Sequence, residues 1–338
     1  MIKHKKLEHL TIPTDTLKEI TDFYLVEDPD NNINKCLVYP GATPVPTDLA
    51  DFVQHLINDC KEENKIDFNL HYIIDNNEKV IFRGHTIYSL EGKVWALRKL
   101  SNSVPDIYTL GYKKNYTELL TSNKLNNGGL IIMCGETGQG KSTTAASAIL
   151  HRMKEYGSFC LTIEDPIEMP LQGRYSGKGG TGICYQTTAG EDQIEHAIKG
   201  ALRSYPSVSN SILFLGEIRT GAMANEVLRI ASNGHLVFTT MHGLDLHSSI
   251  ERFVQMAATH TNMEEVYSML AIVFRLAIHQ RLVTNKATGK KSLDAKILFS
   301  ADGLSQVANK IKAGELKQLG NYIDQQNMKL SRGESILD

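Results

Sequence analysis

Residues 130–142 read Leu-Ile-Ile-Met-Cys-Gly-Glu-Thr-Gly-Gln-Gly-Lys-Ser, an apolar run that passes directly into the pattern G-x-x-x-x-G-K-S. The next residues, 143–150, favour a helix. A strand, a glycine loop and a helix in this order bind phosphate, because backbone N–H groups and the positive end of the helix face the ligand. The stretch therefore predicts an α/β domain that binds ATP, with Lys141 on the β- and γ-phosphates and the Ser142 hydroxyl on Mg²⁺. The expected nucleotide-binding residues of the loop are Gly135, Thr137, Gly138, Gln139, Gly140, Lys141, Ser142 and Thr143.

Short apolar runs alternate with helical segments beyond residue 129, which predicts a mainly parallel sheet with helices on both faces. The expected strands are 130–134, 159–163, 212–215 and 236–240. Beyond residue 245 the pattern predicts helices at about 245–258, 263–279 and 304–327, with one late strand near 295–299. We expect this ATPase domain to span residues 129–338.

The residue pattern of 1–120 predicts a smaller α+β domain. Apolar residues recur at helical spacing from Leu49 to Cys60, and Thr47 is the expected N-cap of that helix. Alternating patterns predict antiparallel strands at 66–72, 80–90 and 94–100, with a turn at Asn76-Asn77. The polar stretch 121–128 is the expected linker between the two domains.

Two apolar runs of the second domain end in acidic residues. Ser211 to Gly216 leads into Glu217, and Phe159 to Ile163 leads into Glu164 and Asp165. The carboxyl ends of parallel strands share the edge where the phosphate loop lies, so Glu217 and Glu164 are candidates to hold Mg²⁺ through water or to orient the attacking water. The sequence does not say which acid takes which role, and an acid that only faces solvent is the alternative for each.

Two further motifs are less specific. His235 and His242 bracket the run 236–241, and their spacing does not fit the zinc motif H-E-x-x-H. Each is a candidate nucleotide contact, with a purely structural histidine as the alternative. Residues 177–182 match G-x-G-x-x-G, but no strand precedes them and no helix follows at once, so we expect a mobile surface loop.

Composition narrows the possible function classes. The chain has 36 Lys and Arg against 38 Asp and Glu, a net charge of −2, so no global charge drives it onto nucleic acid or anionic lipid. No apolar run approaches the roughly 18 residues of a membrane-spanning helix, and no secretory signal is expected. The five cysteines form no C-x-x-C pair. These features predict a cytoplasmic protein without direct nucleic-acid binding.

Four blocks of the second domain together resemble the Walker A, Asp box, Walker B and His box of the type II/IV secretion system ATPases, in particular the PilT- and DotB-like group. They are 135–142 (GETGQGKS), 162–168 (TIEDPIE), 215–219 (LGEIR) and 234–242 (GHLVFTTMH). The resemblance continues through Gln280-Arg281-Leu282-Val283. It implies a PAS-like N-terminal domain, a RecA-like ATPase domain and a homohexameric ring that acts on secretion or pilus proteins at the inner membrane.

The resemblance also assigns roles to residues. Glu217 corresponds to the Walker B glutamate and Glu164 to the Asp-box acid near the metal. His242 and His235 would contact the γ-phosphate. Arg83 and Arg98, on the predicted strands of the first domain, resemble by position the N-terminal-domain arginines that reach the nucleotide, and an isolated surface arginine is the alternative for each. A guanidinium fork suits phosphate charge.

Departures from the family pattern point to a branch. Thr220 stands where retraction motors have Asp, Gly243 stands where their His box continues with Thr, and the cysteine quartet of the pilus-assembly ATPases is missing. We therefore favour a motor for type IVB secretion or conjugation, with pilus retraction as the alternative. A small-molecule kinase or a nucleotide-switched scaffold is the alternative from another class.

Overall fold

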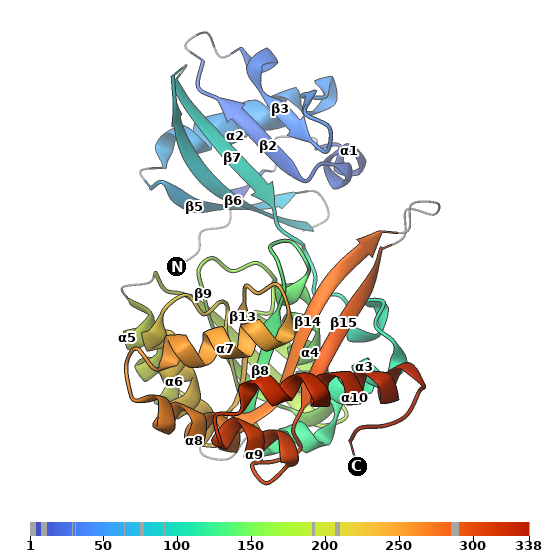
Figure 1. The fold of residues 1–338 in the computed structure, drawn as a ribbon. Helices are drawn as coiled ribbons and strands as arrows, with labels where there is room; N and C mark the ends of the chain where they lie inside the picture. The colour runs from blue at the N-terminus through green and yellow to red at the C-terminus, as the bar shows by residue number, and fades with distance from the viewer. Residues whose placement is uncertain are drawn as a thin grey trace. The chain divides into compact units, whose positions relative to one another are not determined.

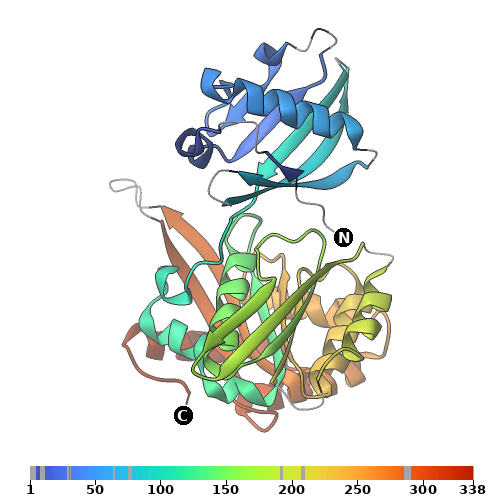
Figure 2. The same cartoon turned by 180° about the vertical axis from the view of Figure 1, so that it is seen from behind.

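The structure, a computed structural model, describes residues 5–7, 12–28, 30, 32–63, 65–74, 78–90, 92–190, 193–206, 210–284 and 291–337. The chain divides into two compact units, Met1–Asn102 and Ser103–Asp338 (Figures 1 and 2). Among the described residues, unit 1 has one hydrophobic core and unit 2 has two. Within the described ranges, no helix has the length and apolar character that crossing a bilayer requires.

Unit 1 is a small α+β domain whose sheet has the strand order β1-β5-β6-β7-β2-β3-β4. The pairings are antiparallel except for β1 with β5. Alternate residues of the long strands face one core, against which the apolar stripe of α2 packs. Its elements are β1 (Lys5–Lys6), α1 (Thr14–Glu19), β2 (Asp22–Val26), β3 (Leu37–Tyr39), β4 (Thr43–Pro44), α2 (Ala50–Glu62), β5 (Asp67–Ile74), β6 (Glu78–Ser89) and β7 (Gly92–Lys99).

The expected helix and strands of unit 1 are confirmed, and one cap is wrong. Thr47 begins a short 3₁₀ turn, Thr47–Leu49, so Leu49 occupies the N-cap position of α2 and no side chain caps that helix. The expected turn at Asn76-Asn77 lies outside the described residues.

Unit 2 is an α/β domain whose sheet has the strand order β10-β11-β9-β12-β13-β8-β14-β15. The strands from β11 to β14 pair in parallel, whereas β10 and β15 are antiparallel edge strands. Its strands are β8 (Gly129–Cys134), β9 (Phe159–Glu164), β10 (Gly173–Gly177), β11 (Gly180–Thr188), β12 (Ser211–Leu215), β13 (Leu236–Met241), β14 (Phe274–Thr284) and β15 (Lys291–Phe299). Its helices are α3 (Lys114–Thr121), α4 (Lys141–Tyr156), α5 (Ile194–Leu202), α6 (Gly221–Ser232), α7 (Leu246–Ala257), α8 (Met263–Val273), α9 (Gln306–Lys312) and α10 (Leu319–Ser331).

Helices cover both faces of this sheet, as the sequence predicts. Successive residues of β8 enter two different cores: Leu130 and Ile132 pack with α6 to α9, and Ile131 and Met133 pack with α3 and α4. Figure 1 shows α7 in front of the sheet, and Figure 2 shows the opposite face. A strand buried on both faces has no polar alternation, which explains the continuous apolar run before the phosphate loop.

The expected boundary between the domains differs from the observed one. Residues 103–128 belong to unit 2, because α3 and the 3₁₀ helix Asn123–Asn127 pack onto α4. The buried Arg152 of α4 donates to the carbonyl oxygens of Leu120 and Ser122, at the end of α3. The stretch 121–128 is therefore ordered structure within unit 2 and not a linker.

The expected helix 263–279 is also only partly right, because α8 ends at Val273 and residues 274–284 form β14. From Leu276 onward the side chains alternate between the two cores, which is the period of a strand. The antiparallel pair β14–β15 then completes the sheet next to β8.

The glycine run 177–182 is not a loose surface loop. It forms the turn of the β10–β11 hairpin, and its backbone lies directly on the end of α4. A Cβ atom on Gly179 would lie 2.4 Å from the carbonyl oxygen of Glu155, and one on Gly177 would lie 2.1 Å from that of Lys154. The glycines therefore permit close contact between the hairpin and the helix.

Helix α10 covers part of the β15 edge with two amide side chains. Gln326 accepts from the Phe299 N–H at 2.8 Å and donates to the Phe299 carbonyl at 2.9 Å. Asn327 does the same with Ile297, at 3.0 and 2.8 Å. The two side chains thus bond the backbone groups that a further strand would otherwise pair.

Candidate active site

The phosphate loop lies where the sequence predicts it, between the buried strand β8 and the 16-residue helix α4. Gly140 precedes the helix in a left-handed conformation, and its carbonyl accepts from the Thr144 N–H at 2.9 Å. Ser142 and Thr143 occupy the first turn, where backbone N–H groups lack partners within the helix and carry its positive dipole end. This end of α4 is suited to bind an anion.

Lys141 is buried beneath the loop. Its Nζ donates to the carbonyl oxygens of Gly135 at 2.9 Å and Glu136 at 2.8 Å. Burial lowers the pKa of Lys141, and the negative charge of Glu217 opposes that shift. The ammonium group therefore lies inside the curve of the loop, at the position that the motif assigns to the phosphate-binding lysine.

Glu217 lies just beyond β12, and both of its carboxylate oxygens have partners. Oε1 lies 2.7 Å from Nε2 of His242, and Oε2 accepts from Nε of Arg219 at 2.9 Å. The turn before it is held by Thr240, whose hydroxyl donates to the Gly216 carbonyl at 2.6 Å. The structure thus brings together two predicted residues, Glu217 and His242, from the ends of adjacent strands.

Glu164 ends β9, the strand on the other side of β12. It is 3% exposed, and this burial raises its pKa to about 7, against the opposing hydrogen bond that Gln186 donates to its Oε1 at 2.9 Å. A Cβ atom on Gly216 would lie 3.3 Å from the Glu164 side chain, so this acid packs beside the turn that carries Glu217. Both predicted acids therefore lie at one edge of the sheet.

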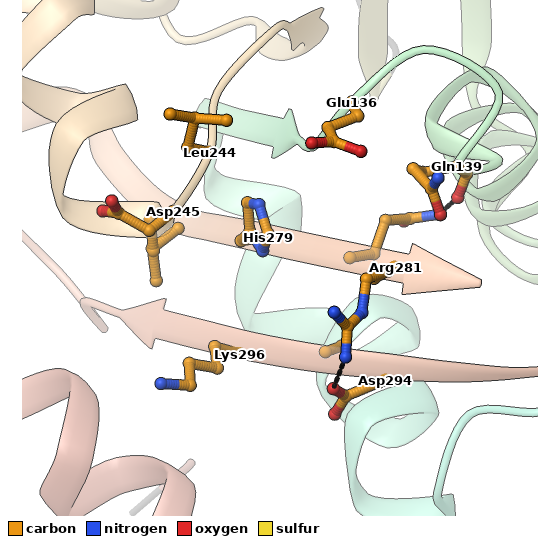
Figure 3. A pocket seen from close by; sticks show the side chains of 11 residues that line it. Glu136, Gln139, Leu244, Asp245, His279, Arg281, Asp294 and Lys296 are labelled. Atoms are coloured by element: carbon orange, nitrogen blue, oxygen red, sulfur yellow. Dashed lines mark hydrogen bonds and ion pairs between the residues drawn. The ribbon is translucent and has the colours of Figure 1, made fainter. Parts of the chain in front are cut away.

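A pocket of about 290 Å³ opens beside the phosphate loop. Glu136 and Gln139 of the loop line one side, and Arg281, Asp294 and Lys296 of the β14–β15 hairpin line the other (Figure 3). Arg281 and Asp294 form an ion pair at 3.9 Å across the hairpin.

Four of the expected nucleotide-binding residues differ in their surroundings. Gln139 is part of the loop, but its side chain is used within the protein, since Oε1 accepts from the Leu282 N–H of β14 at 2.7 Å. Thr137 and Gly138 are exposed at the tip of the loop. Thr143 lies on the first turn of α4, where its hydroxyl has a weak contact with the sulfur of Met169 at 3.9 Å.

The expectation for His235 is wrong. This residue precedes β13, whose first residue pairs with Gly129 at the start of β8, so it lies at the amino edge of the sheet and not at the phosphate loop. Its Nδ1 shares a hydrogen bond with the Ser211 hydroxyl at 2.6 Å, and its ring packs on Tyr205 at 4.5 Å between centroids. Burial lowers the pKa of His235, as expected for a neutral structural histidine.

Arg83 and Arg98 are direct cross-strand partners on β6 and β7 of unit 1. Nε of Arg98 forms an ion pair with Asp22 of β2 at 2.8 Å. The two guanidinium groups thus lie on the same face of the sheet, and their approach to a nucleotide stays a prediction.

Sequence reasoning missed two residues that contact the acids. Arg219 is two residues from Glu217 in the Walker B block, so the sequence could have indicated this contact. The contact of Gln186 with Glu164 could not be found in the sequence, because Gln186 lies on β11, which is a neighbour of β9 only in the folded sheet.

The sequence of this chain is similar to that of known ATPases. Residues 62–321 match the family described as type II/IV secretion system protein. The type IV pilus ATPase PilU of Pseudomonas aeruginosa is 27% identical over 73% of this chain, and the match spans 61% of PilU's own length.

Two solved structures share the whole two-domain architecture. The pilus retraction motor PilT with bound ADP aligns with a TM-score of 0.70 and 25% identity, covering 98% of this chain and 94% of that one. The ATPase DotB of Legionella pneumophila aligns with a TM-score of 0.65 and 16% identity, covering 99% and 97%, and supports the fold alone. The chain therefore belongs to the type II/IV secretion system protein family, as a RecA-like P-loop ATPase preceded by a smaller α+β domain.

Proposed function

We propose that this chain is the subunit of a homohexameric ring motor that hydrolyses MgATP to drive a type IVB secretion or conjugation apparatus. The observation that carries the proposal is the gathering of Lys141, Glu164, Glu217 and His242 around the phosphate loop at one sheet edge. A cation, two acids and a histidine at this place match the parts that phosphoryl transfer to water requires.

Each residue has a role that its surroundings suit. Lys141 and the N–H groups at the start of α4 would hold the phosphates, and Ser142 would supply a hydroxyl ligand to Mg²⁺, a hard cation that prefers oxygen. The bound metal would neutralise charge on the phosphates. Glu217, whose side chain is 21% exposed, would accept a proton from the attacking water, and the buried Glu164 would orient water around the metal.

His242 is suited to contact the γ-phosphate of bound ATP. Its imidazole contacts Glu217 at 2.7 Å and is 43% exposed, so it can reach a ligand without leaving the edge. A histidine that shares a hydrogen bond with the catalytic acid can couple the position of that acid to the phosphate. By likeness to the family, we also propose that Arg83 and Arg98 of unit 1 contact the nucleotide in this reaction.

Pilus retraction is the second candidate, and the 25% identity to the motor PilT over nearly the whole chain favours it. The two residues that depart from the pattern of the retraction motors, Thr220 and Gly243, each fit their local surroundings. Thr220 caps α6, where its hydroxyl accepts from the Met223 N–H at 3.3 Å. A Cβ atom on Gly243 would lie 1.9 Å from the Ser249 hydroxyl.

In either machine we place the ring at the inner membrane, attached through partner proteins. The test of the motor is the mass of the purified chain in solution with and without MgATP, together with its ATPase rate per subunit at increasing protein concentration. We expect a hexamer whose specific activity rises as it assembles, because ring motors share their sites between subunits.

Lys141→Ala is the matched control, since it removes the phosphate-binding cation from an otherwise unchanged chain and should abolish the response to MgATP. A monomer with constant specific activity would reject the ring motor and favour the kinase or switch. The partner proteins then distinguish pilus retraction from type IVB secretion. A hexamer that binds proteins of the pilus base and binds no protein of a type IVB apparatus would favour pilus retraction.

A further inference from the structure

Gln280 breaks the pattern of the strand that carries it. On β14, the side chains of Leu276 and Ile278 enter the core shared with α4, and Gln280 is the next residue on that side. It is 0% exposed. An amide at such a position costs free energy unless its donors and acceptor are bonded, so its partners define what it does.

Those partners belong to the phosphate loop and to a tyrosine beside it. Nε2 of Gln280 donates to the carbonyl oxygen of Gln139 at 2.7 Å, and its Oε1 accepts from the hydroxyl of Tyr112 at 2.6 Å. The same tyrosine oxygen lies 3.3 Å from the hydroxyl of Thr144, in the first turn of α4. Two residues along β14, the Leu282 N–H donates to Oε1 of Gln139 at 2.7 Å.

The backbone of Gln280 is as close to the loop as its side chain. A Cβ atom on Gly135 would lie 2.6 Å from the Gln280 carbonyl oxygen, and one on Gly140 would lie 3.4 Å from its Nε2. The first and last glycines of the loop therefore both lie against this residue. Gln139 of the loop and Arg281 of β14 both line the pocket drawn in Figure 3.

We infer that Gln280, held by Tyr112, is a positioning residue that keeps the phosphate loop in its anion-binding conformation. The inference rests on the proposed nucleotide site. A loop whose N–H groups already point inward binds phosphate without first ordering itself. If the hydrogen bond to Gln139 is lost, the competent conformation becomes a smaller fraction of the molecules, and the apparent Kd rises by the inverse of that fraction.

The test is Gln280→Met, which keeps the length and apolar volume of the side chain and removes its donor and acceptor. We expect the Kd for MgATP, measured by calorimetric titration, and the KM to rise roughly tenfold, with kcat changed less than about twofold. A residue with only a structural role would lower the melting temperature and leave the KM of the folded protein unchanged.

Gln326→Met is the matched control. Gln326 also makes two short hydrogen bonds within unit 2, but both go to the backbone of Phe299 on β15. The substitution and the number of lost bonds are the same as for Gln280→Met. We expect a comparable loss of thermal stability with the Kd and KM of the wild type.

Tyr112→Phe tests the inference independently if Gln280→Met does not fold. It removes the hydroxyl that holds Oε1 of Gln280 and leaves the amide donor in place, so we expect a rise in Kd of about threefold. Wild-type Kd in both folded variants, or in Tyr112→Phe alone if only that one folds, overturns this inference and leaves the proposed function intact. A wild-type chain that binds no MgATP overturns both.

Discussion

At the carboxyl edge of the large sheet, His242 contacts the carboxylate of Glu217, whereas at the amino edge His235 bonds Ser211 and packs on Tyr205. The two histidines lie just beyond opposite ends of the same strand, β13. Both are partly exposed, but His242 contacts a carboxylate, whereas His235 contacts a hydroxyl and an aromatic ring. The direction of the strand therefore decides which of two similar residues can reach a ligand.

The largest effect should come from the carboxyl edge. Glu217→Gln keeps the shape of the side chain and removes its charge and its proton acceptor. We expect kcat to fall by about 10²- to 10⁴-fold with the Kd for MgATP nearly unchanged, as measured by steady-state ATPase assay and calorimetry. Turnover close to that of the wild type would mean that another group activates the water.

Glu164 gives the second test, through pH. Burial raises its pKa from 4.5 to about 7, so between these values the folded chain binds a proton that the unfolded chain has released. Stability from this group is therefore greatest below pH 4.5, falls as pH rises toward 7, and is constant above it, with a total loss on the order of 3 kcal/mol.

Urea unfolding of nucleotide-free protein at pH 5 and pH 8 measures this loss. Glu164→Gln should remove the contribution, because the amide does not titrate, and should raise the stability at pH 8. An identical pH dependence in both proteins would show that Glu164 is ionised throughout.

The two histidines provide the direct comparison of the edges. We expect His242→Asn to lower kcat about tenfold, since it removes the imidazole that contacts the Glu217 carboxylate. His235→Asn should leave kcat and KM unchanged and cost about 1 kcal/mol of stability through the lost contacts with Ser211 and Tyr205. Stopped-flow ATPase assays and thermal unfolding of both variants separate the two outcomes. A kinetic defect in His235→Asn would contradict the division between the edges.

Arg219 should show the smallest effect. Its side chain is 44% exposed, and ion pairs at such positions contribute about 0.2 to 1 kcal/mol. Arg219→Gln is therefore expected to lower kcat by no more than about fivefold, with the loss increasing at low salt. A loss as large as that of Glu217→Gln would assign Arg219 a direct contact with the reacting phosphate.

Much of this edge was predictable, because its motifs are local. The loop at 135–142, the acid that ends β9 and the acid just beyond β12 follow from runs of neighbouring residues, and the structure places them at the expected edge of the sheet. The nucleotide roles of these residues remain predictions. His235 was misjudged because the sequence shows that it flanks a strand, but its link to a γ-phosphate came from family likeness and not from the direction of β13.

Other features depend on contacts that the sequence does not display. The apolar residues between 263 and 279 fit one long helix as well as a helix followed by a strand, and only the place beside β8 decides for β14. Gln186 lies on a different strand from Glu164, and Gln280 lies far along the chain from Gln139 and Tyr112. Their roles appear only when folding brings these residues together.

The amides of α10 bear on how copies of this chain can meet. With Gln326 and Asn327 bonded to both backbone groups of Phe299 and Ile297, that end of β15 has no free hydrogen-bonding pattern to offer to a foreign strand. Growth of the sheet across a subunit boundary is blocked there. A second copy of this chain that packed against this end of β15 would have to contact it through side chains and not by adding a strand to the sheet.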